Sequence, residues 1–199
     1  MEFNYITLGE DCSTAATLNS LGLRKQSLPF DWLVSDMDNI IQCINDEFLF
    51  FHKNLYLNTN KTRVIDYYNF EYPHDYPNHE LFDINQIGTG GFNEKKINDG
   101  WEDYIELNLE KYKRRSDRFL DILNDRKDLI ILYRGSINNV FKFKSFLEFK
   151  FKKNNAKFLV ATNEVSIYDD IITCNPECDG VWNDINIWKI GLEKIISNI

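Results

Sequence analysis

The sequence predicts a single-domain α/β fold with a mostly parallel sheet flanked by helices in three layers. Two continuous apolar runs, residues 129–133 and 158–161, are typical of strands that are buried on both faces. Helix-like stretches with apolar residues at helical spacing lie between and after these runs, and alternating strands and helices indicate parallel pairing. The chain has 199 residues and a hydrophobic content of 43%, so we expect residues 1–199 to bury one core.

The predicted elements of the first half are a strand over 3–8, a helix over 14–21, a loop over 23–35, a helix from Ser35 or Asp36 to about Cys43, and a strand over 63–70. Gly22 ends the first helix, and the Ser or Asp side chain caps the second. The last strand is predicted from its β-branched and aromatic residues, and Pro73 follows it. Residues 76–100 are polar and rich in Asn and Gly, which predicts a long surface excursion.

The predicted elements of the second half are a long amphipathic helix over 101–123, a strand over 129–133, a helix over 138–153, strands over 158–161, 171–173 and 181–182, and a final helix over 187–196. In the long helix the apolar residues recur at helical spacing. The order of these elements repeats the strand–helix alternation on which the fold class rests.

Composition excludes several classes of function. The net charge is −8, whereas binding of nucleic acid needs a basic surface, so we expect no nucleic-acid partner. The sequence shows neither an export leader nor a run of about 20 apolar residues, which predicts a cytoplasmic protein without a membrane partner. The four cysteines are then reduced thiols. Cys174 and Cys178 lack a second close pair, so no metal or other cofactor is expected.

The junction after the first predicted strand provides the candidate nucleophile. That strand stops at Gly9, a helix begins near Ser13, and Cys12 lies between them. Unpaired N–H groups at a helix start favour a thiolate over a thiol. In addition, ligands of open parallel sheets bind beyond the carboxyl ends of the strands. We therefore expect Cys12 to be a catalytic residue.

A thiol nucleophile usually needs a base, and a third group commonly orients that base. The histidines are His52, His74 and His79, of which His74 is favoured because it follows a predicted strand end. Asp75 is adjacent to it in sequence, although neighbouring side chains on a strand point to opposite faces. Asp31, in a loop that can fold over the site, is the other candidate for the third group.

Three further residues are candidates for binding substrate. An arginine near the site can hold a carboxylate or phosphate with two parallel hydrogen bonds. The arginines considered for this role are Arg24, Arg115, Arg118 and Arg134, of which Arg24 and Arg115 are selected. Trp32 follows Asp31 and can shield the site from water. The alternatives are a solvated helix face for the arginines and a core-packing loop for residues 29–32.

Several blocks of the sequence resemble one known family. They are residues 8–15 (LGEDCSTA), 21–24 (LGLR), 27–32 (SLPFDW), the His74-Asp75 dipeptide, 114–119 (RRSDRF) and, more weakly, 129–134 (LIILYR). In these blocks the chain is similar to a family of papain-like cysteine peptidases of otherwise unknown function, found in bacteria and large DNA viruses. The resemblance implies that Cys12 is the nucleophile, that His74 is its base, and that substrates are peptides or isopeptides.

Two other functions remain open at this stage. A cysteine after the first strand of a parallel sheet resembles the layout of α/β hydrolases more than that of papain. Esterase, acyl-transfer or glycosyl-transfer chemistry on the same scaffold is therefore an alternative, with other acyl compounds as substrates. The third possibility is a non-enzymatic interaction module in which Cys12 is packed and residues 76–100 bind a partner.

Overall fold

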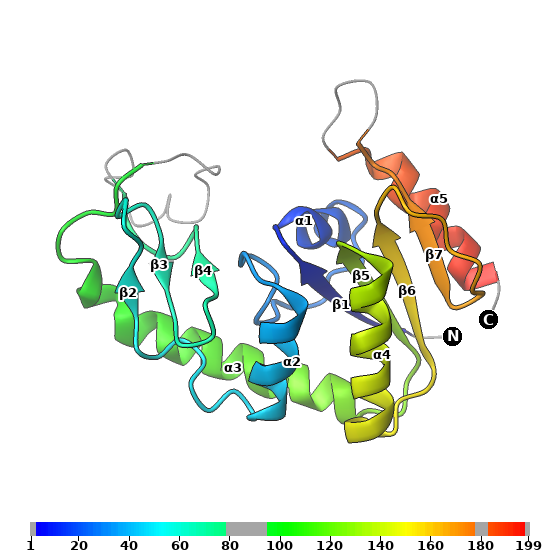
Figure 1. Cartoon of the computed structure of the whole chain (residues 1–199), viewed down its shortest axis with the longest axis horizontal. Coiled ribbons are helices and arrows are strands. Elements are labelled where there is room, and N and C mark those ends of the chain that lie inside the picture. Colours follow the sequence, from blue (N-terminus) through cyan, green and yellow to red (C-terminus); the bar gives the residue numbers. More distant parts are fainter. Residues whose placement is uncertain (1–2, 79–94, 178–182, 198–199) are drawn as a thin grey trace.

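The centre of the molecule is a four-stranded parallel sheet with the strand order β1-β5-β6-β7 (Figure 1). The computed structural model describes residues 3–78, 95–177 and 183–197. The strands of this sheet are β1 (Asn4–Gly9), β5 (Leu129–Arg134), β6 (Ala156–Ala161) and β7 (Ile171–Cys174). The α/β class and the parallel sheet are thus confirmed.

Helices cover both faces of this sheet. They are α1 (Ser13–Ser20) and α5 (Ile185–Ser197) on one face, and α2 (Met37–Asn45), α3 (Ile105–Asn124) and α4 (Ile137–Phe151) on the other. Strand β5 shows why both faces are filled: Ile130 belongs to the core with α1 and α5, whereas Ile131 belongs to the core with α2, α3 and α4. Successive side chains of a strand point to opposite faces, so an unbroken apolar run needs a cover on each side.

A second, antiparallel sheet was not predicted. It consists of β2 (Tyr56–Leu57), β3 (Val64–Ile65) and β4 (Glu71–Tyr72) in that order. The single strand expected over 63–70 is wrong, because the chain reverses within it. The Asp66 carboxylate accepts the backbone N–H groups of Tyr68 and Phe70, both at 3.0 Å, and Asn69 has a left-handed backbone with φ of +61°.

The loop before α2 joins the two sheets. Val34 forms an antiparallel bridge with Glu71 of β4, and the Ser35 hydroxyl donates to the carbonyl of Gly9 at 3.0 Å. The next residue, Asp36, caps α2 as expected by accepting the N–H of Asn39 at 2.9 Å. The end of β1 and the start of β4 therefore contact the same loop, residues 31–36, and this arrangement places the candidate site.

Helix α3 follows a short 3-10 turn, Trp101–Tyr104, and runs beneath both sheets in Figure 1. No helix of the described ranges is both long and apolar enough to span a membrane. The strand expected at 181–182 lies outside the described residues, as do residues 79–94 of the expected excursion over 76–100.

Candidate active site

Cys12 lies where the sequence predicts it, between the end of β1 and the first turn of α1. It occupies the N-cap position of the helix, is half-buried, and its side chain makes no capping hydrogen bond. Three residues earlier, Gly9 has φ of +145°, and a Cβ there would lie 3.0 Å from the backbone N and O of Arg134. The glycine therefore allows β1 to leave the sheet in close contact with the end of β5.

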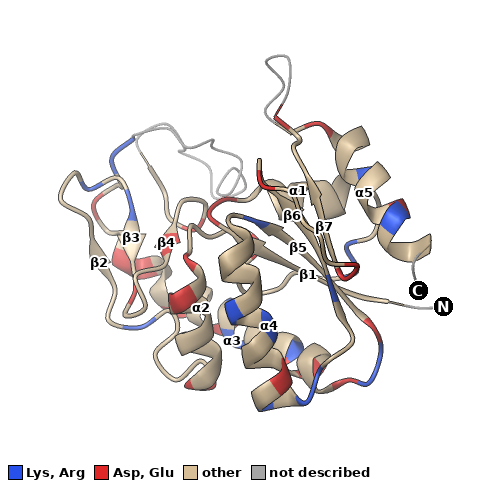
Figure 2. Ribbon diagram, turned by 45° about the vertical axis from the view of Figure 1, so that its right-hand side comes forward, with Lys and Arg blue, Asp and Glu red and all other residues tan. Residues whose placement is uncertain are grey.

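The charges of Asp11 and Arg134 act on Cys12. Asp11 was not considered from the sequence, and Arg134 was considered as a substrate-binding arginine but not selected. The Asp11 carboxylate accepts the N–H of Ser13 at 2.8 Å and lies 3.4 Å from Nε of Arg134. That Nε donates to the Ser13 hydroxyl at 2.7 Å, and the guanidinium also pairs with Glu177 after β7. Figure 2 shows acidic residues on the loops that leave this end of the sheet. The sequence feature that points to Arg134 as a residue of this site is its position at the end of a buried strand.

The electrostatics of Cys12 differ from the sequence expectation. Burial raises the pKa of the Cys12 thiol, and the negative charge of Asp11 raises it further, while Arg134 acts in the opposite direction. The first N–H of α1 is already bonded to Asp11. Burial and Asp11 raise the pKa of Cys12 by more than the helix start lowers it. The resting group is therefore a thiol, and its use as a nucleophile requires a base.

His74 follows β4 and faces the loop that reaches the end of β1. Its half-buried ring packs edge-on against the indole of Trp32, with 6.0 Å between ring centres. The loop over residues 31–36 thus contacts the end of β1 through Ser35 and the His74 ring through Trp32.

Asp75 points away from its neighbour in sequence and into α3. One carboxylate oxygen accepts from Lys111 Nζ, the other accepts from the Tyr112 hydroxyl at 2.7 Å, and the backbone carbonyl accepts from Asn108 at 2.9 Å. Burial by itself would raise the pKa of Asp75, but Lys111 and Tyr112 outweigh it and hold the pKa below its usual range. Asp75 thus anchors the chain beside His74.

Arg115 belongs to the same anchor. Its guanidinium lies 5.3 Å from the centre of the Tyr112 ring, and its charge contributes to the lowered pKa of Asp75. Two separate sequence blocks, the His74-Asp75 dipeptide and the basic segment of α3, therefore meet in space. In this arrangement Arg115 supports Asp75.

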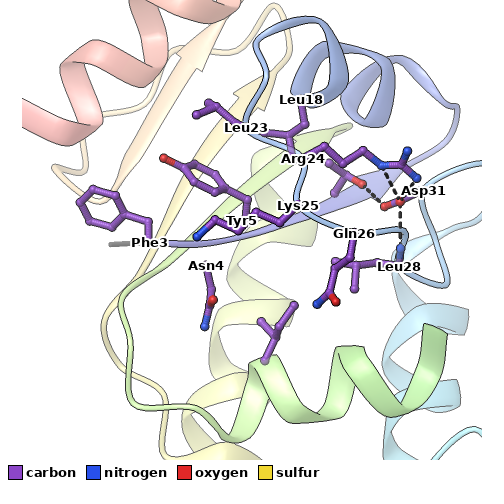
Figure 3. Close-up of a pocket in the computed structure, with 12 residues that line it drawn as sticks. Phe3, Asn4, Tyr5, Leu18, Leu23, Arg24, Lys25, Gln26, Leu28 and Asp31 are labelled. Carbon is purple, nitrogen blue, oxygen red and sulfur yellow. Dashed lines mark hydrogen bonds and ion pairs between the residues drawn. The ribbon is translucent and has the colours of Figure 1, made fainter. Parts of the chain in front are cut away.

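Asp31, which is buried, forms a second cluster with the half-buried side chains of Arg24 and Trp32. Figure 3 shows the pairing of Asp31 with Arg24. The Asp31 carboxylate accepts from Arg24 Nε at 3.1 Å and Nη2 at 2.7 Å, from the Leu28 N–H at 2.9 Å and from the Thr7 hydroxyl at 2.7 Å. The same guanidinium lies 5.4 Å from the centre of the Trp32 ring. The cavity beside these residues has a volume of only about 40 Å³, so it has room for water but not for a substrate side chain.

His52 is buried and packs against Tyr72, Tyr76 and Tyr112. Its ring Nε2 lies 3.0 Å from the Tyr76 hydroxyl, and its backbone N–H donates to the Asp66 carboxylate at 3.0 Å. Burial lowers the pKa of the His52 ring to about 4. His79 and Cys178 lie outside the described residues. Within the described ranges, no group of three or more His, Cys, Asp or Glu side chains is placed to hold a metal ion.

Comparisons with known proteins give one family and one relative. Residues 3–145 match the model of the family described as "Putative papain-like cysteine peptidase". An uncharacterized protein of Acanthamoeba polyphaga mimivirus is 33% identical over 138 residues, which cover 64% of this chain and 60% of the relative. The chain thus spans less than two thirds of that relative. No solved structure matches. The family match extends from β1 into α4 and includes Cys12 and His74.

Proposed function

Because the chain belongs to this family of papain-like cysteine peptidases, we propose that it is a thiol-dependent hydrolase in which Cys12 is the nucleophile. The observation that carries the proposal is the position of Cys12, a half-buried cysteine at the N-cap of α1 and beyond the carboxyl end of β1. Open parallel sheets bind their ligands at this edge. The proposed substrates are peptides or other acyl compounds.

In the proposed reaction, Cys12 Sγ attacks the acyl carbon and its proton passes to the His74 ring. His74 then returns this proton to the leaving amine, and a thioester remains on Cys12. A water molecule attacks the thioester, His74 takes the proton from that water, and the acid product leaves as the thiol is restored. The raised pKa of Cys12 supports a base in this role, since the group is a thiol at rest.

The proposal includes a local movement of Trp32, which packs against the proposed base. The His74 ring lies against the indole, and Ser35 of the same loop bonds to Gly9 at the end of β1. A shift of the Trp32 side chain when substrate binds brings the ring toward the thiol. Catalytic hydrogen bonds are often longer in free enzymes than in substrate complexes.

The start of α1 supplies donors for the oxyanion of the tetrahedral intermediate. The first N–H groups of a helix have no partner within the helix. Asp11 already accepts the N–H of Ser13, so the proposed donor is the N–H of Thr14 in the same turn. Arg134 holds both Asp11 and Ser13, and in this proposal it keeps the donor groups in place.

The test is covalent labelling with a thiol-reactive acyl probe. We expect the wild-type chain to be labelled, Cys12→Ala to be unlabelled, and His74→Ala to be labelled slower by a factor on the order of 10² to 10⁴, which is typical for loss of a general base. Cys174→Ala is the matched control, because Cys174 is also half-buried and also feels the charge of Arg134. Equal labelling of all four proteins would reject the proposal.

Esterase or acyl-transfer chemistry is the second candidate. The observation that favours it is the parallel sheet with Cys12 at its carboxyl edge, a layout shared with hydrolases that act on esters. A screen of ester and peptide substrates with one purified preparation separates the two. Turnover of esters alone, abolished in Cys12→Ala, would favour this candidate.

A further inference from the structure

A second pocket lies away from Cys12, between α3 and the turn that follows α2. One wall is a stripe of α3 formed by Leu109, Lys113, Ser116 and Leu120, and the other wall is the turn over residues 47–53. We call this space the α3 pocket. Its volume is about 380 Å³, within the roughly 300–1,000 Å³ usual for small-molecule sites. None of the residues proposed for the reaction lines it.

Ser116 is the first sign that the pocket is built for a ligand. The residue is only 5% exposed, and its hydroxyl has no hydrogen-bond partner among the described residues. A buried hydroxyl without a partner is costly, and almost all such groups in folded proteins are satisfied. An acceptor atom on a bound molecule would satisfy it here.

The turn that forms the other wall has an unusual backbone. Glu47, Phe48 and His52 all have left-handed φ values, from +52° to +62°, although none is a glycine. Such conformations persist only where the surroundings fix them, and they cluster at ligand clamps. The buried rings of Phe48 and Phe51 hold the turn and line the pocket. The apolar wall is therefore rigid.

Charged groups at the mouth of the pocket restrict the ligand further. Lys53 donates to the carbonyl of Leu49 at 2.8 Å, which leaves two of its ammonium protons for other acceptors. Lys113 precedes Ser116 by three residues on the same stripe of α3. Glu47 and Asp117 also line the pocket, so two positive and two negative side chains balance. This balance disfavours a ligand with several negative charges and fits one with a single charge.

We propose that the α3 pocket binds a monocarboxylic acid with an aromatic or branched apolar body. The carboxylate accepts from the Ser116 hydroxyl and from the ammonium groups of Lys113 and Lys53. The apolar body packs against Phe48 and Phe51. The proposal does not depend on the reaction at Cys12.

The test uses three probes of one shape: 3-phenylpropanoate, its neutral amide, and the dicarboxylate benzylmalonate. Binding to the whole chain is followed in two-dimensional NMR spectra of the backbone amides. A ligand of this size has a dissociation constant on the order of 1 mM when it fits its site. We expect the monocarboxylate to shift the resonances of residues 47–53 and 109–120 in a saturable way, and the amide and the dicarboxylate to bind more weakly.

Two variants identify the contacts. Ser116→Ala removes one hydrogen bond, and we expect it to weaken binding about fivefold without loss of folding. Lys113→Gln should weaken the monocarboxylate and leave the amide unchanged. Ser20→Ala, at the exposed end of α1, is the control and should bind like the parent. Absence of saturable shifts at these residues, or unchanged affinity in Ser116→Ala, overturns the proposal.

Discussion

Replacement of Asp31 by alanine distinguishes a structural role of this residue from a catalytic one. Asp31 is 3% exposed and its partner Arg24 is 17% exposed, so the variant leaves a largely buried guanidinium without its counter-charge. Breaking a buried ion pair costs about 3–5 kcal/mol. The lower end applies here, because Arg24 retains some contact with water. We therefore expect the free energy of unfolding to fall by about 3 kcal/mol, a large part of the roughly 5–15 kcal/mol typical of a domain.

The measurement is equilibrium unfolding in urea, followed by tryptophan fluorescence. A double-mutant cycle with Arg24→Ala tests the pairing, and the double variant should be much less destabilised than the sum of the two single variants. The control is Asp38→Ala, which breaks the exposed pair with Lys142 and should cost less than about 1 kcal/mol. A loss below about 1 kcal/mol for Asp31→Ala, or an additive cycle, would refute the reasoning.

Three further predictions concern pH, packing and thiol reactivity. In the folded protein the pKa of His52 is about 4, because burial disfavours its charged form. Between about pH 6.5 and about pH 4, therefore, only the unfolded chain binds this proton, and the free energy of unfolding falls by about 3 kcal/mol in total as the pH falls through this window. When urea unfolding is compared at several pH values, the fall should be smaller by that amount in His52→Gln. Gly191→Ala places a Cβ 2.5 Å from Leu159 Cδ1. We expect the resulting overpacking between α5 and β6 to lower the free energy of unfolding by about 1–3 kcal/mol. A thermal unfolding midpoint as high as that of the parent would contradict this packing. Asp11→Asn removes a charge that raises the pKa of Cys12, so the pH profile of its alkylation by iodoacetamide should move to lower pH, and an unmoved profile would show that Asp11 does not act on the thiol.

Local patterns in the sequence determined most of the main sheet and its helices. The unbroken apolar run of β5 requires cover on both faces, and the structure has helices on both. Asp36 caps α2 through its own N-terminal turn, a contact between residues three apart in sequence. The location of Cys12 between β1 and α1 followed from the same kind of signal. Each of these features depends on neighbours within a few residues.

Only the tertiary structure decided which polar groups meet. Asp75 follows His74 directly, yet its partners are Lys111 and Tyr112 on α3. The partners of Asp31 include Thr7, 24 residues earlier in the chain. A side chain's partner is set by how whole elements pack, whereas sequence spacing describes one element at a time. For this reason the sequence located the candidate nucleophile, and the packing of α3 and of the 31–36 loop determined the surroundings of the candidate base.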